Sequence, residues 1–169
     1  REKLMGLRAL PMNRLALDNV RVSPTQRLGG EAGIDFPAIL AHSRVALAAL
    51  AVGVMRASLD YAINYAKERE QFGAPIATKQ AIAFMLAECA IEIDAARLMA
   101  WEAAWKLDQG EDASKEAYLA KEYAAKAALT VTDAAVQTLG GHGYIREHPV
   151  ERWLRDARGF AAFEGLAIV

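Results

Sequence analysis

Residues 33–68 read GIDFPAILAHSRVALAALAVGVMRASLDYAINYAKE. Apolar side chains run through this stretch from Ile34 to Tyr65 at helical spacing, with little polar relief in the middle. A helix that is apolar on most of its sides is buried in a bundle or in an oligomer. Gly73 and Pro75 follow, in positions that these residues usually take beyond a helix C-terminus. The stretch therefore predicts one long, buried helix.

Three further helices are predicted after it. One runs from about residue 76 to 108 along an apolar stripe, and an alanine-rich one runs from 114 to 139 with Ser114 as its N-cap. A shorter helix starts near Pro149 and ends near Gly159. Because long helices joined by short loops form an up-and-down arrangement, the predicted fold class is mainly α, an up-and-down four-helix bundle.

The first 30 residues have a different character. Between residues 15 and 22, leucines and valines alternate roughly with polar residues, which indicates one or two short strands. So few apolar positions cannot form an independent sheet, so residues 1–30 are predicted to belong to a sheet whose other strands lie elsewhere. The helical part is assigned to residues 31–169. The sequence starts without methionine and stops inside an apolar run, so we expect a cut at both ends.

Composition excludes several classes of function. Of the 169 residues, 54% are hydrophobic, and the formal net charge of −1 argues against binding to nucleic acid or anionic lipid. The longest weakly polar stretch, Val45–Met55, is too short to cross a bilayer. Cys89 is the single cysteine and lies in an apolar run, so we expect a buried core thiol and a reducing compartment. That compartment is the cytoplasm, or the mitochondrial matrix in a eukaryote.

Other conspicuous side chains are interpreted as structural. His42, His142 and His148 have neither the spacing nor the carboxylate neighbours of a metal site, so no metal is expected. The three tryptophans, Trp101, Trp105 and Trp153, are predicted to be packing residues.

Four stretches have the character of a known family. They are Leu4–Arg8, Arg69–Gly73 with Gln80 after it, Gln137–Tyr144, and Pro149–Arg152 with Arg155–Arg158. In this order and spacing, the chain resembles the acyl-CoA dehydrogenases over essentially its whole length. The resemblance implies that residues 1–30 are the tail of the middle β-domain of that family and that residues 31–169 are most of its C-terminal helical domain. It also implies that the N-terminal helical domain, most of the β-domain and the final helix are missing.

The loop after the first helix is a candidate cofactor site. Arg69 offers a planar fork of donors suited to phosphate oxygens, and Phe72 offers a flat apolar face. The alternative is a helix C-terminus, where an arginine complements the helix dipole. The resemblance implies that Arg69, Gln71 and Phe72 contact the FAD of a neighbouring subunit.

The glycine-rich loop after residue 139 is a second candidate. It follows a helix, so it lacks the strand–turn–helix order of a dinucleotide fingerprint, and a simple helix stop is the structural alternative. The resemblance implies that Gln137, Gly140 and Gly141 belong to the FAD site and that the adenine half contacts this loop. A site built from loops of different subunits requires a dimer, and the family suggests a homotetramer, a dimer of dimers.

Glu164 is the candidate catalytic residue. It lies among apolar residues, and desolvation of such a carboxylate raises its pKa, which suits a general base near neutral pH. A solvated loop glutamate is the alternative. The resemblance implies that Glu164 removes the α-proton of an acyl-CoA thioester while the β-carbon gives a hydride to the flavin. It further places Arg44 and Gly165 at the substrate. A rival position for the base holds Ser43, which cannot abstract such a proton unaided.

Two departures from the family pattern keep alternatives open. Leu166 and Ile168 replace residues whose polar side chains contact the flavin in relatives. The leading hypothesis is a dehydrogenase that passes electrons to an electron-transfer flavoprotein. The alternatives are an acyl-CoA oxidase or another flavoenzyme with altered chemistry, and a non-catalytic helical oligomerisation module. In each case the isolated chain is expected to bind flavin weakly and to be inactive.

Overall fold

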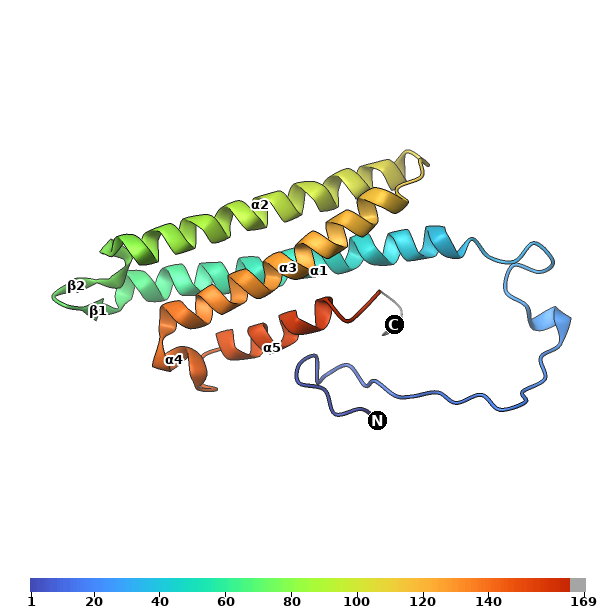
Figure 1. The fold of residues 1–169 in the computed structure, drawn as a ribbon, viewed down its shortest axis with the longest axis horizontal. Coiled ribbons are helices and arrows are strands. Elements are labelled where there is room, and N and C mark those ends of the chain that lie inside the picture. The colour runs from blue at the N-terminus through green and yellow to red at the C-terminus, as the bar shows by residue number, and fades with distance from the viewer. Residues whose placement is uncertain (165–169) are drawn as a thin grey trace.

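The computed structural model describes residues 1–164. Figure 1 shows long helices lying side by side, with the N-terminal segment forming a wide loop beside them. The described elements, in chain order, are η1 (Pro24–Gln26), α1 (Phe36–Glu68), β1 (Glu70–Gln71), β2 (Ala74–Pro75), η2 (Ile76–Thr78), α2 (Gln80–Asp108), α3 (Ser114–Leu139), α4 (Gly141–Tyr144) and α5 (Val150–Phe160). The mainly helical fold class is confirmed, with α5 as a short fourth helix.

Local chemistry sets the start of α1. Asp35 is its N-cap, and the Asp35 carboxylate accepts a hydrogen bond of 3.0 Å from the backbone N–H of Ala38. Pro37 occupies the first turn, where its missing N–H costs nothing. The helix therefore begins at Phe36, slightly later than the sequence pattern indicated, and it ends before Arg69.

Helix α3 lies at the centre of the bundle, because it packs against α1, α2 and α5. Its predicted bounds are confirmed, but the predicted N-cap is wrong. Ala113 occupies the cap position, and the Asp112 carboxylate instead accepts a hydrogen bond of 3.0 Å from the Ser114 N–H. Helix α2 starts later than predicted because residues 76–78 form the separate turn η2.

The core between these helices is built mainly from alanine. Small side chains allow helix backbones to approach closely, and a few larger ones fill the remaining space, among them Met55, Ile93 and Val131. Cys89 is buried as predicted, at 2% exposure. Burial, with the nearby negative charges of Glu88 and Glu92, raises the pKa of the Cys89 thiol to about 11.

No strand forms within residues 15–22 of the described chain, in contrast to the sequence prediction. Within residues 1–35 the 3-10 helix η1 is the one regular element, and the apolar side chains of residues 15–22 are exposed. A strand needs a hydrogen-bonded neighbour, and no other part of the described chain supplies one here. The exposed residues are Leu15, Leu17, Val20 and Val22. The sheet of the described chain is instead the hairpin β1–β2, in which Glu70 pairs with Pro75.

The beginning of the chain is nevertheless attached to α5. The Arg155 guanidinium donates a hydrogen bond of 2.9 Å from Nη1 to the Met5 carbonyl, and the Leu7 N–H donates to the Asp156 carboxylate. Gly6 lies between Met5 and Leu7 and is buried, and a Cβ on Gly6 would lie 2.0 Å from the Arg155 carbonyl oxygen. Only glycine fits this close approach of two backbones.

Two expectations about apolar residues need correction. Trp101 and Trp105 are exposed, at 63% and 57%, whereas Trp153 packs edge-on against Tyr61 as predicted. Helix α1 is also long and apolar enough to cross a membrane by length and composition, although Val45–Met55 by itself is too short. The core helix of a soluble protein passes the same test, and α1 packs against α2, α3 and α5. We therefore interpret α1 as a bundle helix.

Candidate active site

A groove lies at one end of the bundle, where the β1–β2 hairpin and the turn between α3 and α4 meet. It has a volume of about 520 Å³. All the residues predicted to bind the cofactor line it, although they come from two parts of the chain: Arg69, Gln71, Phe72, Gln137, Gly140 and Gly141. The fold thus brings the two candidate loops into one site.

The hairpin presents an aromatic ring at its tip. Phe72 and Gly73 form the two-residue turn, with φ angles of 56° and 77°. A left-handed backbone is strained for phenylalanine but not for glycine. The Phe72 side chain is 93% exposed. A strained, solvent-exposed aromatic ring at the edge of a groove suits contact with a planar ligand or a partner chain.

The opposite wall is the C-terminus of α3. Gly140 has a φ of 59°, which ends the helix, and its N–H donates to the Val136 and Gln137 carbonyls. A Cβ on Gly140 or Gly141 would meet no atom within 4 Å. These two glycines therefore leave open space beside the backbone, whereas a Cβ on Gly143 would lie 2.4 Å from the Val136 carbonyl oxygen.

Other groove residues were missed by the sequence analysis. Lys79, the residue before α2, supplies a second cation to the groove. Tyr65 and His142 also line the groove, and the Tyr65 hydroxyl and the His142 Nδ1 share a hydrogen bond of 2.7 Å. Lys79 stands next to the family-like Gln80, and that position was the signal that could have identified it. The pairing of Tyr65 with His142 depends on the fold and had no signal in the sequence.

The composition of the groove fits a dinucleotide. Two cations, Arg69 and Lys79, suit a diphosphate, the side-chain amides suit a base or ribose, and apolar residues suit the faces of ring systems. The apolar lining residues are Phe72, Ile76, Ile82 and Leu139. Among residues 1–164, no group of histidine, cysteine, aspartate or glutamate side chains could hold a metal ion.

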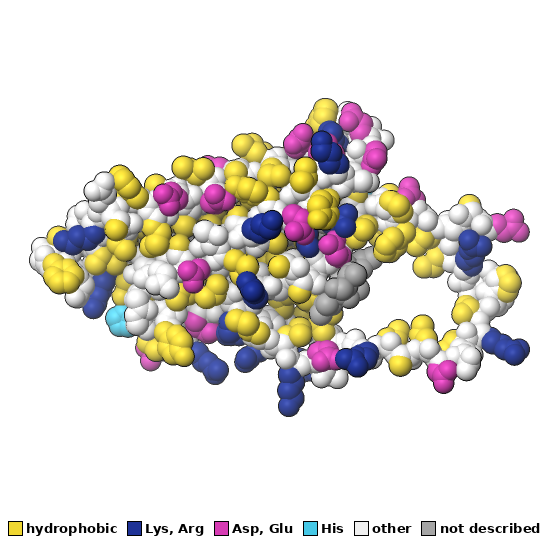
Figure 2. Space-filling model, in the orientation of Figure 1, with side chains coloured by type: hydrophobic (Ala, Val, Ile, Leu, Met, Phe, Trp, Pro, Cys, Tyr) yellow, Lys and Arg dark blue, Asp and Glu magenta, His cyan; other side chains and the backbone are white. Residues whose placement is uncertain are grey.

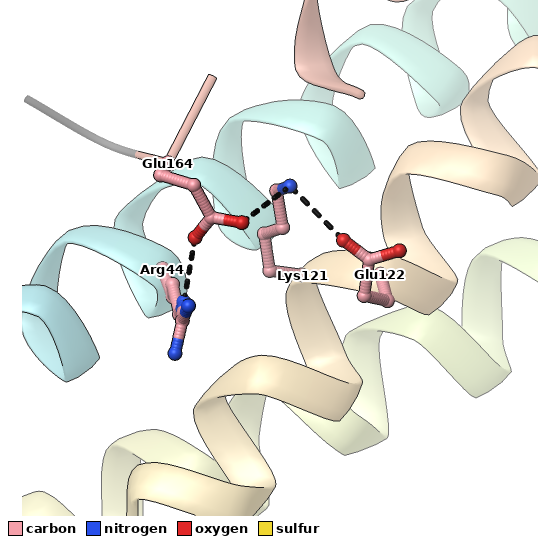
Figure 3. A network of polar contacts seen from close by, with 4 residues as sticks. All are labelled: Arg44, Lys121, Glu122 and Glu164. Atoms are coloured by element: carbon pink, nitrogen blue, oxygen red, sulfur yellow. Dashed lines mark hydrogen bonds and ion pairs between the residues drawn. The ribbon is translucent and has the colours of Figure 1, made fainter. Parts of the chain in front are cut away.

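Glu164 occupies a different place, between α1 and α3. Its Oε2 lies 2.7 Å from the Nε of Arg44 on α1, and its Oε1 lies 3.3 Å from the Nζ of Lys121 on α3. Figure 3 shows the carboxylate pointing between these two cations, with Glu122 on the far side of Lys121. The Glu164 side chain is only 26% exposed.

The predicted rise in the pKa of Glu164 is wrong. Burial does raise this pKa, but the hydrogen bond from Arg44 and the positive charges of Lys121 and Arg44 together lower it further, so the net direction is downward. The neighbours of Glu164 along the chain are apolar, and Phe163 is buried, as expected. The deciding cations come from distant helices, which the local sequence could not show.

Arg44 is paired, as an arginine in an apolar stretch must be. Besides its contact with Glu164, its guanidinium lies 5.1 Å from the centre of the Tyr118 ring. Arg44 is therefore fixed against both Glu164 and α3. The other predicted substrate residue, Gly165, lies outside the described residues, as do Leu166 and Ile168.

Lys121 was not predicted at all. Its side chain is 3% exposed, although lysine is rarely buried. A signal did exist: Lys121 follows Ala117 by four residues and precedes Ala124 by three, so it stands within the alanine stripe that faces the core.

The groove and Glu164 lie near opposite ends of α1. Arg44 lies in α1 and Arg69 directly follows the helix, roughly 25 residues later, which corresponds to ~37 Å at about 1.5 Å per residue. The two sites of one chain are therefore separated by most of the bundle.

Known proteins resemble this chain along most of its length. Residues 36–167 match the family model of the acyl-CoA dehydrogenase C-terminal domain. The chain is similar to the 3-(aryl)acrylate reductase of Clostridium sporogenes, with 41% identity over 170 residues that cover 99% of the chain and 45% of that protein. The chain spans less than half the length of the curated relatives it matches.

Solved structures share the fold. The butyryl-CoA dehydrogenase from Megasphaera elsdenii superposes with a TM-score of 0.77 and 40% identity, over 80% of this chain and 36% of that one. The protein PigA, solved with FAD and proline, superposes with a TM-score of 0.72 and 30% identity, over 75% of this chain and 33% of that one.

Proposed function

The chain belongs to the acyl-CoA dehydrogenase family, and we propose that it supplies parts of two different active sites of a FAD-dependent acyl-CoA dehydrogenase. The observation that carries this proposal is the Glu164 carboxylate, which is mostly buried and held by one cation on each oxygen. Residues 1–30 are assigned to the tail of the middle β-domain, and the isolated chain is expected to be inactive.

Glu164 is the catalytic base of the proposed reaction. Its lowered pKa keeps the carboxylate ionised at neutral pH, which is the form that accepts a proton, and makes it a weaker base than a free glutamate. It takes the proton on the α-carbon of an acyl-CoA thioester, and the backbone N–H of Glu164 stabilises the developing enolate oxygen. A bound FAD supplies the acceptor for the hydride that leaves the β-carbon. The carbon–carbon double bond then forms, and the proton stays on the Glu164 carboxyl.

FAD is the cofactor that the comparisons support, and the groove is the part of this chain proposed to hold it. Arg69 and Lys79, which line the groove, are proposed to pair with its diphosphate, and Gln137 is proposed to hold its adenine half. One bound molecule whose reactive ring reached Glu164 would have to span the length of α1. We therefore assign the groove to the flavin of a neighbouring subunit, so that each active site needs two chains.

Exposed apolar surface supports an oligomer. An apolar stripe runs along the outer side of α2, and the side chains in it are more than half exposed (Figure 2). The stripe consists of Phe84, Ile91, Leu98, Trp101 and Trp105. A second apolar surface, of alanines and Gly53 together with Leu50 and Val54, lies along α1 from Ala46 to Ala57. Patches of this kind mark contact with other chains, and a dimer of dimers would cover both.

The partners proposed for the whole protein are an acyl-CoA substrate and an electron-transfer flavoprotein in a reducing compartment. A second candidate function is reduction of an unsaturated acyl group, because one relative with 41% identity is a 3-(aryl)acrylate reductase. Saturated and unsaturated thioesters offered separately to the oxidised and the reduced protein would show which direction is productive.

The test is Glu164→Gln in the flavin-loaded protein encoded by the complete reading frame. General base catalysis contributes about 10²–10⁴-fold, so flavin reduction by acyl-CoA in stopped flow should become slower by about 10³-fold. Glu111→Gln, in an exposed loop, is the matched control and should keep the wild-type rate. Fast reduction in Glu164→Gln would refute the assignment. A colourless full-length protein would favour the oligomerisation module instead.

A further inference from the structure

Lys121 is the buried charge that the proposed reaction leaves unexplained. Its ammonium group lies inside the bundle on α3, 3.0 Å from Glu122 Oε1 and 3.3 Å from Glu164 Oε1. Within residues 1–164, the charged side chains that contact Glu164 are Arg44 from α1 and Lys121 from α3. Lys121 is therefore the only group in the described chain that links the candidate base to a second carboxylate.

Stability alone gives little reason for a lysine at this position. Taking an ammonium and its partners out of water is costly, and an apolar side chain of similar volume is often equally stable or more so. The surroundings on α3 are alanines, so a methionine would fill the same space. A buried lysine in contact with the proposed base therefore points to a role in that chemistry.

The two oxygens of Glu164 are held unequally. Oε2 makes the shorter contact, 2.7 Å, with the Arg44 Nε. Oε1 makes the longer contact, 3.3 Å, with an ammonium that also bonds to Glu122 at 3.0 Å. Since Lys121 is shared between two carboxylates, Oε1 is the less strongly engaged oxygen and the better one to receive a proton.

We propose that Lys121 is a positioning residue for Glu164, which holds Oε1 ionised while Glu122 limits how tightly the ammonium binds it. This rests on the proposed role of Glu164 as the base. When Glu164 takes the α-proton, it becomes neutral and its attraction to Lys121 is lost. Lys121 then keeps Glu122 as its ion-pair partner, and Arg44 keeps its contact with the Tyr118 ring.

The first test is Lys121→Met in the flavin-loaded, full-length protein, with flavin reduction measured across pH. Loss of a nearby positive charge makes Glu164 easier to protonate. The acid limb of the rate profile should move to higher pH, with a rate about tenfold lower than wild type on that limb and close to wild type at alkaline pH. A rate lowered by the same factor at every pH would indicate a merely structural role and would overturn the proposal.

A second variant, Glu122→Gln, tests the proposal independently in case Lys121→Met does not fold. Glu122 is 35% exposed, so Glu122→Gln should fold normally. Without Glu122, Lys121 interacts with Glu164 alone, and the acid limb should move in the opposite direction, to lower pH. An unchanged acid limb in Glu122→Gln would contradict the proposal even if Lys121→Met could not be purified.

Infrared difference spectra of the same proteins provide a readout that does not depend on turnover. The carboxyl band of Glu164 is assigned by its absence in Glu164→Gln, and its titration should shift upward in Lys121→Met and downward in Glu122→Gln. If Glu164→Gln still reduced flavin, the proposed base would fail, but the infrared titration would still decide whether Lys121 controls Glu164. A Glu164 band that titrates identically in wild type, Lys121→Met and Glu122→Gln would refute the role of Lys121.

Discussion

The two ends of α1 carry sites of opposite design. At its C-terminal end, Arg69 lies beside an open groove with an exposed aromatic ring and free space at two glycines. Near its N-terminal end, Arg44 is paired with Glu164 in a mostly buried cluster of charges. The first site offers cations to a ligand from outside, whereas the second has its cations already engaged within the chain. The groove is therefore suited to binding, and the Glu164 cluster to holding one reactive group in place.

Of the changes considered for the two ends of α1, Arg69→Glu is expected to have the largest effect, and it acts on FAD binding at the groove. A charge-assisted hydrogen bond is worth about 1.5–3 kcal/mol, so reversing this charge should weaken FAD binding by tenfold or more. Flavin affinity of the full-length apoprotein, followed by flavin fluorescence, measures it. Lys67→Glu is the matched control, since Lys67 is exposed in the last turn of α1 and does not line the groove. Equal losses in both variants would mean that the groove has no specific role.

Gly6→Ala should affect the Glu164 end, because Gly6 and Phe163 line the same small pocket beside α5. The new Cβ would collide with the Arg155 carbonyl oxygen, and overpacking of this kind costs about 1–3 kcal/mol. The free energy of unfolding should fall by that amount, and the Leu7 amide should exchange with solvent faster, because its bond to Asp156 is disturbed. Ala9→Gly, at an exposed position of the same segment, is the control. Unchanged exchange at Leu7 would show that this attachment does not matter.

The smallest effect is a pH dependence of stability at Glu164. A carboxyl whose pKa is lowered by folding stabilises the protein above its unfolded pKa, and that contribution disappears as the pH falls through the folded pKa. Wild type should therefore exceed Glu164→Gln in unfolding free energy by about 1 kcal/mol at neutral pH and by nothing in acid. Denaturant titrations at several pH values measure the difference. If the difference in unfolding free energy between wild type and Glu164→Gln persisted in acid, the ion pairs of Glu164 would not be its cause.

The parts that the sequence predicted are those with local causes. The bounds of α3 follow from its alanine stripe and from the glycines after Leu139, and both were visible in the sequence. The groove residues were found through short motifs in two loops, although the motifs could not show that the loops meet. Cys89 was correctly placed in the core because its neighbours along a helix are apolar.

The parts that the sequence missed have causes elsewhere in the fold. The pKa of Glu164 was predicted in the wrong direction because its cations, Arg44 and Lys121, lie 120 and 43 residues away. The alternation within residues 15–22 is typical of a strand, but strand formation needs a partner that the described chain does not contain. Trp101 and Trp105 were expected to pack, and in one chain they remain exposed.

The separation of the two sites leads to a test by mixed dimers. If the groove of one subunit serves the Glu164 of the other, a dimer of Glu164→Gln and Arg69→Glu subunits contains one fully intact active site. A dimer of wild type with the double variant then contains none, because each site receives one altered residue. If both sites served the same active centre within one chain, these two outcomes would be exchanged.

The most direct measurement is the rate of flavin reduction per dimer in such mixtures, prepared by co-expressing two differently tagged full-length chains. We expect the dimer of Glu164→Gln with Arg69→Glu to reach about half the wild-type rate, since one of two symmetric sites is intact. With FAD supplied at a concentration that fills wild-type grooves but not Arg69→Glu grooves, the dimer of wild type with the double variant should be as slow as Glu164→Gln. Activity in the second mixture but not in the first would contradict the assignment of the two ends of α1 to different active sites.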